Sequence, residues 1–115
     1  MQNPTSPAVK LQIAGQTFEL VFDFEAIADA EEITGRPLLT GLRRNDIESP
    51  SINLVRAMLF ACIHARHSLT TFAQAKVLVT RKNLADVWGK VLEAWTEGLA
   101  EPEPEAVADP PESQS

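Results

Sequence analysis

The stretch VKLQIAGQTFELVFDF, residues 9–24, decides the fold expected for this 115-residue chain. Apolar and polar residues alternate on both sides of a short glycine-containing segment, residues 14–17, a pattern typical of a β-hairpin. The alternating apolar residues are Val9, Leu11 and Ile13 before the turn, and Phe18, Leu20 and Phe22 after it. We therefore expect a hairpin within residues 8–22, with one of these two apolar sets facing the rest of the protein.

Directly after the hairpin, the apolar spacing changes from a period of two to that of a helix. Asp23 is placed to cap the start of this helix, and Gly35 to end it in a left-handed conformation. The residues that recur at helical spacing, and that we expect on its apolar face, are Phe24, Ile27, Ala28 and Ile33. A hairpin leading straight into a helix, with no catalytic residue type in it, favours an interaction module over an enzyme.

The remainder of the chain is predicted to be mainly helical. We expect a short helical turn at residues 38–42, a polar loop at residues 43–49, and a helix over residues 52–67 that is apolar on nearly every face and hence central. Thr70 or Thr71 is placed to cap a shorter helix. The last helix has one apolar stripe, made of Leu84, Trp88, Val91, Trp95 and Leu99. The expected fold is α+β and mainly α, with an N-terminal hairpin packed on about four helices.

Composition indicates one domain, residues 8–100, between two polar segments. Residues 1–7 read as a disordered lead-in, and residues 101–115 as an acidic, proline-rich, disordered tail. The net charge of −6 arises mostly in that tail, which holds five acidic residues and no basic one. The 11 acidic residues before it nearly balance the 10 basic residues of the chain, so the body has no basic face for nucleic acid.

Membrane insertion and disulfide formation are also disfavoured. The longest apolar stretch, residues 57–63, has seven residues, against the roughly 20 that span a bilayer. The N-terminus lacks the apolar core of a signal peptide. Cys62 is the only cysteine, so it has no partner for an internal disulfide, which fits a reducing cytoplasm.

No catalytic, cofactor or metal site is expected from the residues. Cys62, His64 and His67 are of metal-ligand types, but the cysteine lies about 200° from His64 around a helix, and neither histidine belongs to a zinc motif. We interpret the cysteine as a core residue and the histidines as surface or helix-end residues. The clustered carboxylates of Asp29, Glu31 and Glu32 are read as a solvated helix face.

The stripe of the last helix is the one candidate binding feature. Trp88 and Trp95 would fill the core, or one of them would anchor a partner, since tryptophan is enriched at binding hot spots. The candidate partner-binding residues are Trp88, Trp95 and Leu99. The core interpretation is favoured because the stripe is continuous with Leu84 and Val91. We expect that whichever indole is more exposed is the anchor.

The order and spacing of these parts resemble the small tail assembly chaperones of long-tailed bacteriophages and of gene-transfer-agent-like particles. The match covers about residues 8–100. The segments that carry it are VKLQIAGQTFELVFDF (9–24), EAIADAEEITGRPLL (25–39), INLVRAMLFACIHA (52–65), LTTFAQAKVLV (69–79) and NLADVWGKVLEAW (83–95).

The resemblance implies a cytoplasmic protein without enzymatic activity or cofactor, made in an infected or lysogenic bacterium. Such chaperones coat the tape measure protein, keep it soluble, and help to recruit tail tube subunits. The implied partners are therefore the tape measure and tail tube proteins, with self-association left open. Two alternatives remain: a structural or completion subunit of a phage tail, and a small regulatory adaptor with an acidic tail.

Overall fold

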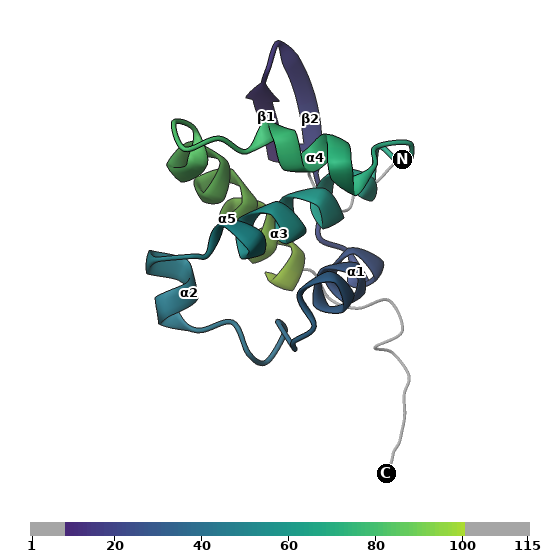
Figure 1. The fold of residues 1–115 in the computed structure, drawn as a ribbon. Helices are drawn as coiled ribbons and strands as arrows, with labels where there is room; N and C mark the ends of the chain where they lie inside the picture. Colours follow the sequence, from purple (N-terminus) through teal and green to yellow (C-terminus); the bar gives the residue numbers. More distant parts are fainter. Residues whose placement is uncertain (1–8, 101–115) are drawn as a thin grey trace.

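A computed structural model describes residues 9–100, and in them a two-stranded hairpin is followed by five helices (Figure 1). The α+β, mainly helical fold expected from the sequence is confirmed, with one helix more than expected. The lead-in at residues 1–7 and the tail at residues 101–115 lie outside the described residues. The elements are β1 (Val9–Ile13), β2 (Gln16–Leu20), α1 (Phe24–Thr34), α2 (Arg44–Glu48), α3 (Ile52–His64), α4 (Phe72–Leu78) and α5 (Leu84–Ala100).

The hairpin is closed by a two-residue turn, Ala14-Gly15. Both residues have positive φ, 53° and 75°, as the tight turns that match the twist of paired strands require. Val9 pairs with Leu20 and Ile13 with Gln16. Opposite residues of an antiparallel pair share a face, so both expected apolar sets face the helices rather than only one. That face lies on α3 and α5.

Helix α1 has the expected ends but a different buried face. The Asp23 carboxylate accepts a hydrogen bond from the N–H of Ala26 (2.8 Å), and Gly35 ends the helix at a φ of 71°. The buried residues are Ala26 and Ala30, however. Of the residues predicted for the apolar face, Ile27 is half-buried, whereas Phe24 and Ile33 are 65% and 39% exposed and Ala28 is also exposed.

The cause is the packing of α1 against α3. Ala26 and Ala30 are four residues apart and small, so they let the two helix backbones approach closely along that line. The larger side chains of α1 are then turned toward the margins of the contact or to solvent. The prediction of the α1 face was wrong because it rested on the helical spacing of apolar residues, and spacing does not show that a close contact between two helices favours small side chains.

The polar loop predicted at residues 43–49 is also wrong, since most of it is helix α2. The Asp46 carboxylate accepts from the N–H of Arg43 (2.9 Å), which satisfies a free donor at the helix start. It also binds Arg36 across the preceding loop, at 2.6 Å. The short turn predicted at residues 38–42 is a single hydrogen-bonded turn, closed by the N–H of Leu42 and the carbonyl of Leu38.

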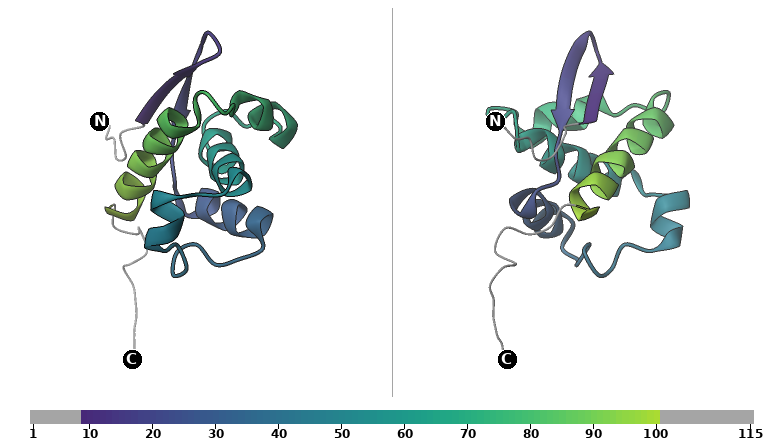
Figure 2. Two further views of the ribbon diagram at one scale, coloured as in Figure 1. Left: turned by 60° about the vertical axis from the view of Figure 1, so that its left-hand side comes forward. Right: turned by 180° about the vertical axis from the view of Figure 1, so that it is seen from behind.

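Helix α3 is the central element, as predicted, although it ends at His64 rather than at residue 67. It contacts α1, α4, α5 and β2, and Figures 1 and 2 show it enclosed by them. Helix α4 is capped by Thr71, whose hydroxyl accepts from the N–H of Gln74 (3.1 Å). Within residues 9–100, no helix is both long and apolar enough to cross a bilayer.

Candidate interaction surface

Both tryptophans of the α5 stripe lie in the core. Trp88 and Trp95 are each 6% exposed, so neither is more exposed than the other. The Trp88 indole N–H donates to the carbonyl of Ile47 (2.9 Å), which fastens α2 to α5. The Trp95 ring meets Phe22 edge to face, with ring centroids 5.1 Å apart. The core interpretation of both indoles thus fits the structure. Because their exposure is equal, it singles out neither indole as a partner anchor.

Leu99, the third candidate binding residue, lies near the end of the same helix and is 49% exposed. It is the last residue of the stripe. Its accessible side chain is available to a partner.

The residues of metal-ligand type are used for structure. Cys62 is fully buried, burial raises the pKa of its thiol, and the thiol donates to the Leu59 carbonyl (3.4 Å). The His67 Nε2 accepts from the N–H of Glu19 (3.1 Å), and the His64 ring stacks on Phe60. Among residues 9–100, no group of three or more His, Cys, Asp or Glu side chains converges on a point.

The acidic cluster on α1 is only partly a solvated face. Glu32 is exposed as predicted, and Asp29 is half-buried. The Glu31 carboxylate accepts from the N–H groups of Leu38 and Leu39, at 2.8 and 3.0 Å. These two hydrogen bonds, the one from Leu39 first, hold the pKa of Glu31 below its ordinary value. Glu31 therefore holds Leu38 and Leu39, in the loop after α1, close to the helix.

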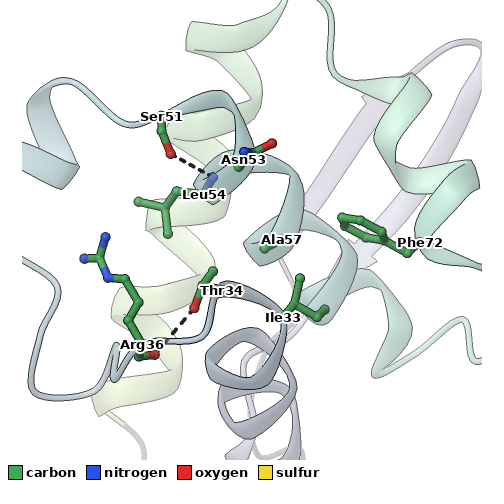
Figure 3. A pocket seen from close by; sticks show the side chains of 8 residues that line it. All are labelled: Ile33, Thr34, Arg36, Ser51, Asn53, Leu54, Ala57 and Phe72. Atoms are coloured by element: carbon green, nitrogen blue, oxygen red, sulfur yellow. Dashed lines mark hydrogen bonds between the residues drawn. The ribbon is translucent and has the colours of Figure 1, made fainter.

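A cleft opens between α1, α3 and the start of α4 (Figure 3). Its apolar part is formed by Ile33, Leu54, Ala57 and Phe72, and the rest of its lining by Thr34, Arg36, Ser51 and Asn53. Its volume is about 340 Å³, near the lower end of the range for binding pockets. Ile33 and Phe72 stand at its sides, and the buried Leu54 and Ala57 of α3 also line it. A helix with its side chains is 10–12 Å wide, so the cleft suits one or two inserted side chains rather than a whole helix.

Phe72 is held in place as a wall of this cleft. Its ring meets Phe60 edge to face, with centroids 5.6 Å apart, and Phe60 in turn stacks on His64 at 5.0 Å. The Lys76 ammonium lies 5.8 Å from the Phe72 ring centre. Although 37% exposed, this ring is therefore supported by α3 and by its own helix.

The polar groups of the cleft mostly have partners already. The Ser51 hydroxyl accepts from the N–H of Leu54 (3.0 Å), and the Thr34 hydroxyl donates to the Ala30 carbonyl (2.9 Å). Arg36 reaches away to Asp46 and to the Gly41 carbonyl. A ligand would gain few new hydrogen bonds from these three groups, and the exposed Asn53 is the remaining polar lining residue. The part of the cleft between Ile33 and Phe72 suits an apolar side chain.

A second hollow of about 340 Å³ lies on the other side of Arg36 and is lined by polar residues of the loop and of α2. The Arg36 guanidinium donates two hydrogen bonds to the Asp46 carboxylate, at 2.6 and 3.4 Å. This pairing, with the N–H of Arg43, keeps the pKa of Asp46 below its ordinary value. The charge of Arg36 is thus already neutralised, and the apolar cleft is the better candidate.

Comparison of the chain with protein-family models, curated proteins and solved structures finds no match.

This cleft was not predicted from the sequence. Ile33 was expected on the buried face of α1, and no binding role was assigned to Phe72. The available signal was the alanine pair Ala26 and Ala30, which marks the face of α1 that approaches α3. Ile33 lies on the same face, at spacings of i+7 and i+3 from the alanines, but in the last turn of the helix, where the cleft opens.

Proposed function

We propose that this protein is a phage tail assembly chaperone that binds the tape measure protein and keeps it soluble, and that it acts in the cytoplasm without enzymatic activity. The observation that carries the proposal is the apolar cleft with its supported aromatic wall, Phe72. The sequence resemblance supplies the identity of the partner.

A tape measure protein is a long helical chain whose apolar stripes aggregate when exposed. A cleft of this size buries one or two side chains of such a stripe at a time, which gives weak binding at each contact. Many weak contacts along one long tape measure protein together keep it covered and soluble, while each copy of the chaperone still dissociates readily. That combination is what a chaperone displaced by tube subunits requires.

Further apolar side chains extend the surface available to such a partner. Isolated exposed apolar residues are common in proteins and carry no meaning alone. Leu99 on α5 is one of the nine large apolar side chains that are at least 37% exposed within residues 9–100. The other eight are Phe24, Ile33, Leu39, Ile47, Ile52, Leu69, Phe72 and Val77.

Co-expression with the cognate tape measure protein tests the proposal. We expect the tape measure protein to be insoluble alone, soluble with this chain, and to elute with it as a complex in gel filtration. An unrelated aggregation-prone helical protein, expressed with this chain in the same way, is the control for general solubilisation, and it should remain insoluble. If the tape measure protein is equally soluble with and without this chain, and no complex survives gel filtration, the chaperone proposal fails.

A second experiment tests the main alternative, a structural subunit of the tail. A structural or completion subunit of the tail would remain in purified particles, whereas a chaperone should be absent from them. Mass spectrometry of purified particles distinguishes these outcomes.

A further inference from the structure

The outer edge of strand β1 has no backbone hydrogen-bond partner within residues 9–100. The two-residue turn makes Ile13 and Gln16 a hydrogen-bonded pair, and bonded and non-bonded pairs then alternate along the hairpin. The N–H and C=O groups of Lys10 and Gln12 therefore point away from β2. Both of these residues are exposed.

The outer edge of β2, in contrast, is covered. By the same alternation, Thr17, Glu19 and the following Val21 point outward, and two of these three are bonded. The Glu19 N–H donates to His67 Nε2 (3.1 Å), and the Val21 N–H, just past the strand, donates to the carbonyl of Cys62 (2.9 Å). Helix α3 and the loop after it thus occupy this edge, and among the described residues only the β1 edge is left to accept a strand.

We propose that the β1 edge pairs with β1 of a second copy of this chain, antiparallel and about a two-fold axis at Leu11. In this register, Lys10 lies opposite Gln12 of the second copy, and Gln12 opposite its Lys10. These are the residues whose N–H and C=O groups point outward, so each pair forms two backbone hydrogen bonds. The result is a continuous four-stranded antiparallel sheet.

The side chains of β1 fit this pairing in both directions. The strand Val-Lys-Leu-Gln-Ile alternates apolar and polar residues symmetrically about Leu11, so an antiparallel copy places apolar side chains beside apolar ones. On the polar face, a lysine meets a glutamine and no like charges face each other. On the apolar face, Ile13 meets Val9 of the second copy.

Ile13 gives a reason for the pairing to be favourable. It is only half-buried, whereas Val9, Leu11, Phe18 and Leu20 on the same face are buried. Figure 2 shows the turn end of the hairpin pointing away from the helices. Ile13, the last residue of β1 before the turn, packs against the core with only part of its side chain. A neighbouring strand would cover it and would extend a two-stranded sheet, which is marginal by itself, to four strands.

Light scattering coupled to gel filtration, on the full chain alone, tests this interface over a range of concentrations. We expect twice the chain mass for the wild type. Gln12→Pro removes one outward N–H and should give a monomer. Thr17→Pro is the matched control, because Thr17 is the cross-strand partner of Gln12 but its N–H points to the other edge. It should remain dimeric, with circular dichroism confirming that both variants fold.

Cysteine cross-linking tests the register without introducing proline. Lys10→Cys and Gln12→Cys chains, mixed and oxidised with glutathione disulfide, should give more disulfide-linked dimer than either chain alone. Native Cys62 is fully buried and does not interfere. A monomer at every concentration overturns the proposal, and so does a dimer without preference for the mixture. Because no tape measure protein is present, neither outcome bears on the proposed function.

Discussion

At the scale of residues, a few side chains join elements that are far apart in the sequence. The Trp88 indole joins α5 to α2, Trp95 packs on Phe22 after the hairpin, and His67 fastens the loop after α3 to β2. Each contact combines burial with a specific geometry. The net stability of a domain of about 90 described residues is only about 5–15 kcal/mol, so the free energy that each contact contributes is a large fraction of it.

The two tryptophans should behave as core residues when truncated. Trp88→Ala and Trp95→Ala should each lower the free energy of unfolding by about 3–5 kcal/mol, since each leaves a cavity and Trp88 also loses its hydrogen bond to Ile47. Leu99→Ala is the control on the same helix and should cost less than about 1 kcal/mol, because Leu99 is half exposed. Urea denaturation measures all three. A tryptophan variant as stable as wild type would contradict the core placement.

Glu31 should make stability depend on pH. Its pKa is lowered in the folded protein, so its contribution is complete above the unfolded-state value of about 4.3 and is lost as the pH falls through the lowered value. Glu31→Gln should lower the melting temperature at pH 7 and flatten its fall between about pH 5 and 3. Glu32→Gln, a neighbouring exposed residue, should leave that profile unchanged. Equal profiles for wild type and Glu31→Gln would refute this role.

At the scale of elements, the sequence predicted the periodic elements well and the contacts between them less well. The hairpin, the central α3 and the α5 stripe were found because alternation or helical spacing extends over many residues. Helix α2 was missed because its Asp46 and Ile47 are held by Arg36 and Trp88, which both lie outside its own five residues. The buried face of α1 was misassigned because two alanines set the helix-to-helix distance.

Two glycines of α5 should respond oppositely to the same substitution. A Cβ at Gly98 would collide with the carbonyl oxygen of Phe22, so Gly98→Ala should push α5 from the chain that follows β2 and destabilise the protein. At Gly89 a Cβ would meet nothing within 4 Å, so Gly89→Ala should stabilise the helix by up to about 1 kcal/mol. Melting temperatures of the two variants compare them directly. The same sign of change for both would contradict this packing of α5.

At the scale of the whole molecule, the arrangement separates two surfaces. The cleft between α1, α3 and α4 is proposed to receive apolar side chains of the tape measure protein, and the β1 edge to pair with a second copy. Neither could be predicted from the sequence, because each depends on what the remaining elements leave uncovered. The sequence did supply the residue types: Ile33 and Phe72 for the cleft, and the symmetric alternation of residues 9–13 for the edge.

The most direct test of the chaperone account is the affinity of cleft variants for a soluble helical segment of the cognate tape measure protein. Measured by biolayer interferometry, Phe72→Ala and Ile33→Ala should each weaken binding about tenfold or more, the effect of losing about 1.4 kcal/mol. Val77→Ala is the matched control, since Val77 is on α4 about 140° from Phe72 and is 75% exposed, and it should bind as wild type does. Undiminished binding by both cleft variants, in protein whose melting temperature is unchanged, would contradict the account.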